Sequence, residues 1–331
     1  MTPEGTLLLK RGEVAALLGI EECIAAVEQV FKLQGEGKTA PPGVLGVHAR
    51  DGGFHIKAGL LELDRAYFAA KTNANFPQNV GRFGLPLIQG VIVLCDAENG
   101  YPLALMDSIE ITIQRTGAAT AVAAKHLARA DSKVVTVCGC GNQGRVSLRA
   151  LRQVLPIEKA FVYDSDHALA QKFACELADK LRIEVEAVRD LETAALRSDI
   201  LVTCTPSRQA FLKQNFVSPG TFVAAVGADS QEKQELEPSL TARAKIVADN
   251  LEQCATIGEL HHALDAGLVS REQVHAELGE VVAGVKAGRE SAEEVIVFDS
   301  TGMALQDVVS AAAVYEKAVC LGRGTLLNFS G

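Results

Sequence analysis

Three glycines, Gly139, Gly141 and Gly144, form the first stretch whose residue types and spacing point to chemistry. They follow a short apolar run and precede a helix-like segment that opens with Asn142 and Gln143. In a G-x-G-x-x-G turn the first glycine permits a tight bend, the second lets the backbone approach a phosphate, and the third lets helix and strand pack closely. The helix N-terminus adds partial positive charge. We therefore expect these five residues to hold the pyrophosphate of a dinucleotide.

Asp164 supports this interpretation. It ends the next strand-like run, "FVYD", where a carboxylate would accept hydrogen bonds from the hydroxyls of an adenosine ribose. A carboxylate there favours NAD, because it would repel the 2′-phosphate of NADP. Ser165 and His167 could moderate that repulsion, so NADP stays a second candidate. The plain alternative is a glycine turn beside a solvated aspartate, with no nucleotide.

Two basic residues stand among small and apolar neighbours. Lys71 lies in "YFAAKTNAN", and a lysine is costly to bury unless it is paired or functional. It either hydrogen-bonds the carbonyl or carboxylate of a bound acid or is an edge-strand lysine that reaches solvent. Arg115 is the only charged residue between Glu110 and Lys125. Its guanidinium fork matches a carboxylate with two parallel hydrogen bonds, so it indicates an amino or imino acid ligand, against the alternative of a helix-surface arginine.

Polar residues also follow three other strand-like runs, at the ends where parallel α/β sheets bind ligands. Asp229 follows "TFVAAVGA", and its alternative role is to cap the helix-like segment "DSQEKQEL". Residues 299–302, which include Ser300, follow "EVIVF" at another strand end, and their plain interpretation is a cap on the last helix. We expect residues 205–207, after "DILVTC", to lie along the nicotinamide ribose; they are Thr205, Pro206 and Ser207.

The part of the chain from residue 133 onward alternates strands and helices. Short apolar, β-branched runs separated by helical segments predict a parallel sheet covered on both faces. The seven candidate strands are "KVVTVC", "KAFVYD", "IEVEAV", "DILVTCT", "TFVAAVG", "KIVADN" and "EVIVFD". The predicted class is therefore α/β, with a Rossmann-type, doubly wound sheet.

The first 115 residues have a different pattern. Apolar spacing over residues 11–34 predicts one helix. "AYFAAKTNANF" is a strand candidate, and "LPLIQGVIVLCDAENGYPLALMD" predicts a hairpin whose turn contains Asn99-Gly100. Asp107 or Ser108 caps the long helix that follows. We expect an α+β domain with antiparallel character.

The last segment, "STGMALQDVVSAAAVYEKAVCLG", predicts a long helix that returns to the first domain. This makes the substrate-binding and dimerisation domain discontinuous, with residues 1–116 and 303–331, around a nucleotide-binding domain of residues 117–302.

Composition excludes several classes of protein. The 331-residue chain has a net charge of −9 and no basic stripe, so nucleic acid is not an expected partner. No apolar run has the length of a membrane span, and no secretory signal is seen.

We interpret the eight cysteines as buried thiols and expect a cytoplasmic protein. Neither Cys138 and Cys140 nor the adjacent His261 and His262 have metal-ligand spacing, so we expect no metal.

Six stretches together resemble the ornithine cyclodeaminase/mu-crystallin family, and within it most closely the archaeal-type alanine dehydrogenases. They are "GLPLIQGVIVLCDAENGYPLALMDS", "QRTGAATAVAAKHLAR", "CGCGNQG", "TCTPSR", "VGADSQEKQEL" and "GEVVAGVKAGRESAEEVIVFDSTGMALQDV". The resemblance implies a homodimer formed through the first domain and NAD(P) bound in the second. It implies that Lys71 and Arg115 bind substrate, that Thr116 and Ser300 lie near the cofactor or substrate, and that Asp229 is the general acid/base.

Two departures from the family pattern bear on the substrate. Many relatives carry a basic residue where this chain has Gly43, and Met-Pro where it has Lys57-Ala58. A carboxylate contact is then expected to move to Lys57 or His55, which affects substrate identity more than reaction type.

Three functions remain open on the sequence. The first is reversible hydride transfer between nicotinamide and the α-carbon of a small L-amino or imino acid, as in alanine dehydrogenase or a cyclic imine or ketimine reductase. The second is an ornithine cyclodeaminase lyase, which would convert L-ornithine to L-proline and ammonia and recycle NAD. The third is a crystallin-like protein that binds NAD(P)H with little catalysis.

Overall fold

The computed structural model describes residues 5–328, which form two units. The first unit comprises the chain up to Val30, Gly37–Arg115, and the chain from Met303 on. The second comprises Phe31–Glu36 and Thr116–Gly302. The sequence-based division placed residues 31–36 and Thr116 in the first domain.

Within the described residues, the first unit contains a seven-stranded sheet in the order β17-β1-β6-β5-β4-β3-β2. Neighbouring strands are antiparallel, except that β1 and β6 are parallel. The strands are β1 (Thr6–Leu9), β2 (Gly43–Ala49), β3 (Gly52–Glu62), β4 (Ala66–Asn75), β5 (Ile88–Asp96), β6 (Pro102–Asp107) and β17 (Thr325–Leu327). The predicted hairpin is confirmed as β5 and β6.

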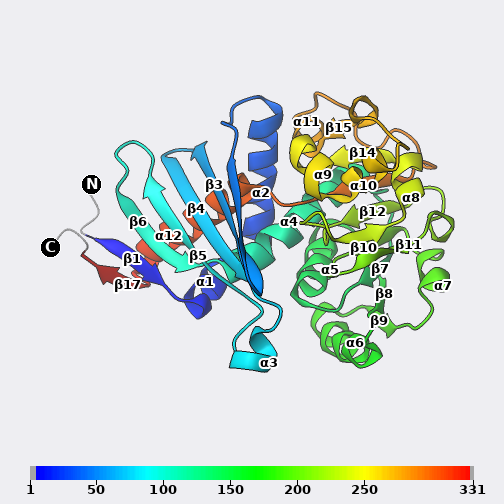
Figure 1. Cartoon of the computed structure of the whole chain (residues 1–331), viewed down its shortest axis with the longest axis horizontal. Coiled ribbons are helices and arrows are strands. Elements are labelled where there is room, and N and C mark those ends of the chain that lie inside the picture. The colour runs from blue at the N-terminus through cyan, green and yellow to red at the C-terminus, as the bar shows by residue number, and fades with distance from the viewer. Residues whose placement is uncertain (1–4, 329–331) are drawn as a thin grey trace. The chain divides into compact units, whose positions relative to one another are not determined.

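Helices pack on one face of this sheet. Figure 1 shows α12 crossing behind the sheet, where it contacts β3 and β4. Alternation along β4 explains the contact, because Tyr67, Ala69 and Lys71 are buried on one face while Phe68 is exposed on the other. The helices that carry residues of this unit are α1 (Arg11–Leu17), α2 (Ile20–Gly35), α3 (Asn79–Phe83), α4 (Ile109–Leu127) and α12 (Ala304–Leu321).

The helix predicted over residues 11–34 is wrong as a single element. The chain leaves the helical conformation at Leu18, whose backbone is extended, and resumes as α2 at Ile20. Gly19 between them has low helix propensity, and the break lets Leu17, Leu18 and Ile20 all be buried. Asp107 rather than Ser108 caps α4, since its carboxylate accepts hydrogen bonds from the backbone N–H of Ile109 at 2.9 Å.

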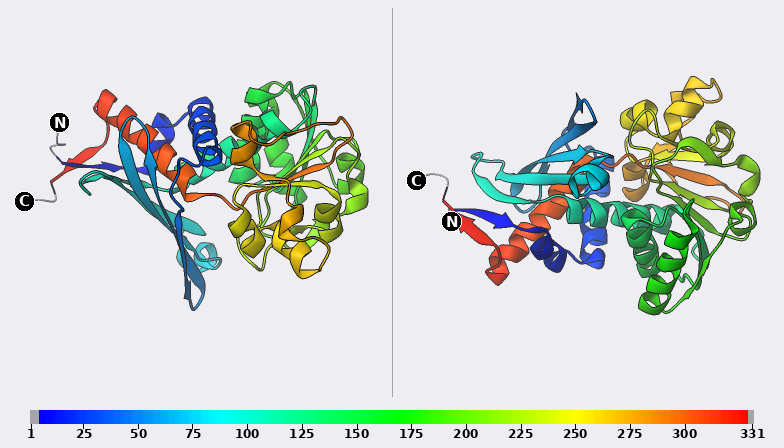
Figure 2. Two further views of the ribbon diagram at one scale, coloured as in Figure 1. Left: turned by 90° about the horizontal axis from the view of Figure 1, so that it is seen from above. Right: turned by 60° about the horizontal axis from the view of Figure 1, so that its bottom comes forward.

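The second unit is the predicted Rossmann-type fold. Its parallel sheet has eight strands within the described residues, in the order β15-β14-β16-β12-β10-β7-β8-β9. Helices α5 and α6 cover one face and α9 and α10 the other (Figure 2). The strands are β7 (Val134–Cys138), β8 (Lys159–Tyr163), β9 (Glu184–Ala187), β10 (Ile200–Thr203), β12 (Phe222–Ala225), β14 (Lys245–Ala248), β15 (Ala276–Glu277) and β16 (Ile296–Asp299).

The remaining elements of this unit surround the sheet. The helices are α5 (Asn142–Val154), α6 (His167–Leu181), α7 (Leu191–Ala195), α8 (Pro238–Arg243), α9 (Leu251–Ile257), α10 (Glu259–Asp265) and α11 (Leu278–Val282), with 3₁₀ turns η1 (Gln214–Phe216) and η2 (Arg271–Gln273). Strands β11 (Arg208–Leu212) and β13 (Gln234–Leu236) form a separate parallel pair. The sequence did not predict this pair or β15, because strands of two to five residues give too short a pattern. Residues 31–36 belong here because α2 packs against α11: a Cβ on Gly35 would lie 2.0 Å from the Gly279 carbonyl oxygen.

Two further findings concern the class of protein. No helix within residues 5–328 has both the length and the apolar character needed to cross a membrane. All eight cysteines lie in this range and are free, but the expectation that all are buried is wrong, since Cys175 and Cys320 are exposed.

Candidate active site

The first unit contains a buried cluster of two cations around one carboxylate. Lys71 comes from β4, Arg115 from α4 and Asp307 from α12. Lys71 Nζ lies 2.6 Å from Asp307 Oδ2, and Arg115 Nε lies 3.3 Å from Asp307 Oδ1. The side chains of Lys71 and Asp307 are only 4% and 2% exposed. Both surface alternatives are therefore wrong: β4 lies inside the sheet, and the arginine faces the interior of its unit.

Polar neighbours complete the cluster. Gln306 Oε1 accepts a hydrogen bond from Arg115 Nη1 at 3.2 Å, and Lys71 Nζ lies 3.5 Å from Thr112 Oγ1. Gln306 is fully buried, and its Nε2 has no hydrogen-bond partner among the residues that the structure describes. A buried donor without a partner is costly. The cluster thus keeps a donor available for an acceptor such as a ligand oxygen.

The pKa of the lysine in this cluster lies near neutral pH. Burial lowers the pKa of Lys71 to about 7, although the charge of Asp307 opposes the shift. Burial by itself raises the pKa of Asp307, but the charges of Lys71 and Arg115 outweigh it and hold that pKa below its ordinary value. With Lys71 protonated, two cations share one anion, so the cluster carries a net positive charge suited to a carboxylate.

Lys57 and His55 lie on the strand beside Lys71. In the antiparallel register of β3 and β4, Lys57 is directly opposite Lys71 and His55 is opposite Asn73. Directly opposed residues share a face of the sheet, and the charge of Lys57 contributes to lowering the pKa of Lys71. His55 is exposed and Lys57 is half-buried. Gly43, the other departure from the family pattern, pairs with Ala58.

Asp307 is a residue of this cluster that the sequence did not predict. The available signal was one acidic residue in the apolar run "ALQDVVSAAAVY". An acidic residue in a buried helical face needs a partner, but the sequence does not identify the partner.

The glycine turn in the second unit fits a dinucleotide. Gly139 has a φ of 106°, a conformation that favours glycine. A Cβ on Gly144 would lie 2.1 Å from the Gly139 carbonyl oxygen, so turn and helix approach closely. A Cβ on Gly141 would meet no atom of the described chain within 4 Å. That open space lies at the N-terminus of α5, which begins with Asn142 and Gln143 and is not capped by a side chain from residues 5–328.

Asp164 lies directly beside this turn. Its Oδ2 accepts a hydrogen bond from the Cys140 backbone N–H at 2.8 Å, and its Oδ1 accepts one from the Asp166 N–H at 3.0 Å. The carboxylate is half-exposed. It therefore shapes the turn and keeps accessible surface for a ribose.

Residues 205–207 follow β10, as predicted, and are held by hydrogen bonds. Ser207 N–H donates to Thr205 Oγ1 at 3.2 Å, Thr205 is bound by the buried Glu235, and Pro206 is exposed. Nothing in the sequence pointed to Glu235, because it lies in the helix-like stretch "DSQEKQEL".

Asp229 follows β12 in a turn, and its side chain is exposed. It lies 2.5 Å from Lys233 Nζ. The prediction of a helix after Asp229 is wrong, because residues 229–233 form a turn that leads into β13. His262 Nε2 lies 2.8 Å from the Lys233 carbonyl oxygen, so this histidine has a packing role, as expected.

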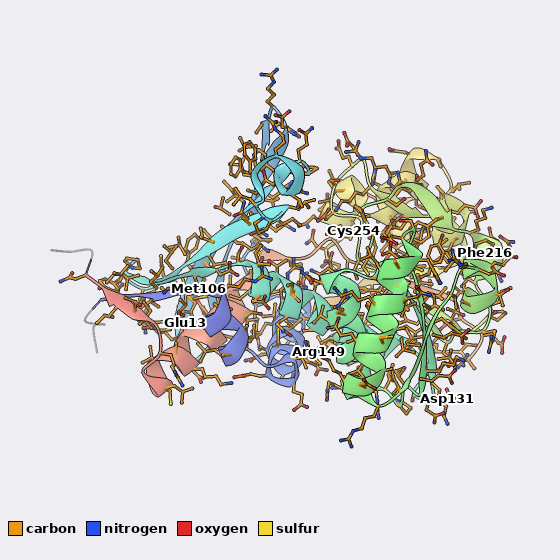
Figure 3. All side chains as sticks on the ribbon, turned by 90° about the horizontal axis from the view of Figure 1, so that it is seen from below. Glu13, Met106, Asp131, Arg149, Phe216 and Cys254 are labelled. Atoms are coloured by element: carbon orange, nitrogen blue, oxygen red, sulfur yellow. The ribbon has the colours of Figure 1, made fainter. Side chains whose placement is uncertain are left out.

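The N-cap position of the last helix lies just beyond residues 299–302. The N-cap of α12 is Met303, and Ser300 instead donates to Asp249 Oδ2 at 3.1 Å. Cys254 of α9, labelled in Figure 3, donates from Sγ to Asp249 Oδ1 at 3.3 Å. Burial raises the pKa of Asp299 to about 7. Its Oδ2 accepts the Leu260 N–H, while its Oδ1 has no partner within the described chain.

Thr116 is buried at the start of the second unit, and its carbonyl oxygen accepts a hydrogen bond from Thr120 Oγ1 at 3.0 Å. Across residues 5–328, no three His, Cys, Asp or Glu side chains are grouped so as to hold a metal ion.

Comparisons with known proteins agree with this architecture. Residues 4–321 match the model of the ornithine cyclodeaminase/mu-crystallin family. An archaeal alanine dehydrogenase dimer with bound NAD is 40% identical, with a TM-score of 0.93 over 98% of this chain and 99% of that one. The Thermococcus litoralis Δ1-pyrroline-2-carboxylate reductase in complex with NADH and L-proline is 37% identical, with a TM-score of 0.92 over 97% and 100%.

A third solved structure is also similar. The iminosuccinate reductase of Paracoccus denitrificans in complex with NAD⁺ is 33% identical, with a TM-score of 0.91 over 98% of this chain and 100% of that one. The glycine turn, the parallel sheet and the family match over nearly the whole length agree, and the chain belongs to the ornithine cyclodeaminase/mu-crystallin family.

Proposed function

We propose that this chain is an NAD-dependent oxidoreductase that transfers a hydride between nicotinamide and the α-carbon of a small L-amino or imino acid. The buried cluster of Lys71, Arg115 and Asp307 carries the proposal, because two cations around one carboxylate leave a positive charge for the carboxylate of an acid. The glycine turn before α5 supplies the nucleotide cradle. The three similar structures are a dehydrogenase and two reductases, and they support net hydride transfer over cyclodeamination.

Each cluster residue has a defined role in the proposal. Arg115 binds the substrate carboxylate, and Lys71 donates to the same carboxylate or to the carbonyl oxygen. Asp307 keeps both cations oriented, and Lys57 and His55 contribute further contacts from β3. Binding the acid in one orientation accounts for much of the rate in such a reaction.

The second unit supplies the cofactor contacts. We assign the pyrophosphate to Gly139, Gly141 and Gly144 with the N–H groups of Asn142 and Gln143. The adenosine ribose is assigned to Asp164, which favours NAD over NADP. Residues 205–207, Thr116 and Ser300 are assigned to the nicotinamide end. When bound, NAD supplies the hydride chemistry.

Asp229 is proposed to move a proton to or from the substrate nitrogen, or from the water that attacks an imine. Its exposed side chain lies 2.5 Å from Lys233 Nζ, so a substrate group at this carboxylate would compete with Lys233. Asp229→Asn should abolish turnover and leave NAD affinity unchanged. Turnover that survives this replacement would show that the proton shuttle is misassigned.

One substrate panel tests the reaction type. L-alanine, L-ornithine, L-lysine, L-proline, pyruvate with ammonia or methylamine, and cyclic imines are assayed for both nicotinamide absorbance and ammonia. The proposal predicts a stoichiometric change in NADH with at least one substrate. Product without net NADH change would indicate the lyase, and NADH binding without turnover would indicate the crystallin-like protein.

We also propose a homodimer formed through the first unit. On the sheet face opposite α12, large apolar side chains of β3, β4 and β5 are exposed: Phe54, Leu60, Phe68, Val91 and Val93. An apolar patch of this kind usually marks an interface, and one similar structure is a dimer. Phe68→Asp should yield a monomer in light scattering, whereas Leu268→Asp, an exposed leucine of the second unit, should not.

A further inference from the structure

Glu235 is a buried carboxylate that the proposed reaction does not use. It lies in the short strand β13 and is 0% exposed. Its Oε1 accepts hydrogen bonds from the Thr205 backbone N–H at 2.6 Å and from Thr205 Oγ1 at 2.7 Å. Its Oε2 accepts the Gly227 N–H at 3.1 Å. One side chain thus connects two separate loops, one by each oxygen.

The two loops follow neighbouring parallel strands. Strands β10 and β12 pair up to Thr203 and Ala225, and their carboxyl ends lie at the same edge of the sheet (Figure 1). The first N–H groups past the strands, those of Cys204 and Val226, still donate to strand carbonyl oxygens. The following N–H groups of Thr205 and Gly227 need another acceptor, because a buried N–H group without a partner is costly. Glu235 supplies acceptors to Thr205 and Gly227.

Gly227 shows how close this contact is. A Cβ at that position would lie 2.4 Å from Glu235 Oε2 and 2.5 Å from its Cδ. The carboxylate therefore occupies the space in which any larger residue would place its side chain.

Glu235 is itself fixed from the opposite side. Glu259, the first residue of α10, accepts the backbone N–H groups of Glu235 at 2.7 Å and of Leu236 at 3.1 Å. The Gln234 N–H donates to the Ser207 carbonyl oxygen at 2.9 Å. Strand β13 is thus attached to α10 and to the first loop, and it presents the Glu235 carboxylate in one position.

Both connected loops carry residues of the proposed reaction. The first contains Thr205, Pro206 and Ser207, assigned to the nicotinamide end, and the second contains Asp229, two residues after Gly227. We propose that Glu235 is a positioning residue that fixes the Asp229 loop relative to the nicotinamide-binding loop. This inference rests on the proposed function. Glu235 touches neither substrate nor cofactor. It sets the distance between the Asp229 carboxylate and the loop assigned to the nicotinamide end.

Glu235→Gln is the direct test. The amide has the same shape but replaces one acceptor oxygen by an NH₂ donor. If its oxygen stays with Thr205, the NH₂ group opposes the Gly227 N–H and displaces the Asp229 loop. We expect kcat to fall by about 100-fold, since a displacement of about 1 Å costs that much, while the Kd of NAD changes by less than about 3-fold.

Glu237→Gln is the matched control. Glu237 lies just after the same strand, and its Oε2 accepts the Gln214 N–H at 2.9 Å, away from both loops. It should keep kcat within about 2-fold of the wild type. Gly227→Ala pushes against Glu235 without changing any charge, and should reproduce the kinetic pattern of Glu235→Gln. It keeps the inference testable if Glu235→Gln fails to fold.

Amide hydrogen exchange, measured on the protein without substrate, tests this inference independently of the proposed function. Glu235→Gln should raise amide exchange in peptides covering residues 203–207 and 226–230, and Glu237→Gln should not. A wild type without turnover on the whole panel would overturn the proposed function, and the exchange result would still decide whether Glu235 connects the loops. The inference is overturned if exchange is unchanged, if kcat is unchanged, or if both glutamine variants lose kcat equally.

Discussion

Replacing Asp307 by asparagine separates its charge from its shape. Asn keeps an oxygen acceptor in the first turn of α12, but removes the anion 2.6 Å from Lys71 Nζ. Burial has already lowered the pKa of Lys71 to about 7, and the charge of Asp307 is the main force that opposes this shift. The variant therefore lowers the pKa of Lys71 further. A nearby opposite charge is worth about 1–3 pKa units.

The size of the effect follows from the protonated fraction of Lys71. At pH 7.5, a pKa near 7 leaves roughly a quarter of the lysine protonated, and a pKa near 5 leaves about 0.3%. If only protonated Lys71 binds the acid, kcat/KM at pH 7.5 should fall by roughly 50- to 100-fold. The loss should be smaller at lower pH, because the lysine regains its proton.

The assay is the pH profile of kcat/KM for whichever acid the panel identifies. In the wild type, kcat/KM should decline as the pH rises through about 7, and in Asp307→Asn this decline should move about 2 units to lower pH. Asp307→Glu keeps the charge and should hold the decline near its original position. Ser310→Ala, one turn further along α12, removes only a 3.6 Å contact with Cys23 Sγ and controls for disturbance of the helix.

A decline that stays at the same pH in Asp307→Asn would refute the electrostatic role. So would a kcat/KM within about 3-fold of the wild type at pH 7.5. An equal loss at every pH would instead show that Asp307 acts through the geometry of Arg115 alone.

Three other predictions concern the second unit. Gly144→Ala should destabilise the fold by about 1–3 kcal/mol in urea unfolding, because the new Cβ would lie 2.1 Å from the Gly139 carbonyl oxygen. Gly141→Ala should leave stability unchanged, because its Cβ meets no atom, and should weaken NAD binding in a fluorescence titration. Asp164→Asn keeps an acceptor for the turn but removes the charge, so the kcat/KM ratio of NADP to NAD should rise by at least about 10-fold, since like charges in contact cost several kcal/mol. Burial raises the pKa of Asp299 from 3.8 to about 7, so the folded state binds more protons than the unfolded chain between these values and stability falls as pH rises through this window. Asp299→Asn should remove its share of that fall, about 2–3 kcal/mol between pH 5 and pH 8, as measured by urea unfolding at these two pH values. The first prediction is contradicted if Gly144→Ala and the wild type have equal unfolding curves. The second is contradicted if Asp164→Asn keeps the cofactor preference of the wild type, and the third if Asp299→Asn loses as much stability with rising pH as the wild type does.

The sequence by itself determined much of the second unit. Strand runs, helix spacing and the glycine turn are local patterns, and the apolar runs leave a parallel sheet as the simple way to bury both faces. It also singled out Lys71 and Arg115, because a charge among small apolar neighbours is visible within a few residues. The same reasoning failed over residues 11–34, where Gly19 ends one helix, and at β11 and β13, whose pattern is too short.

Only the tertiary structure decided how these charges are used. Asp307 meets Lys71 and Arg115 from the last helix, and Glu235 connects Thr205 with Gly227. No spacing rule links these residues, because their partners are far apart in the chain or belong to its backbone. The free energy of a buried charge depends on which groups surround it in space. Residue type therefore marked where chemistry was expected, and folding determined the pKa of Lys71, the partner of Arg115 and the acceptor for the two loops.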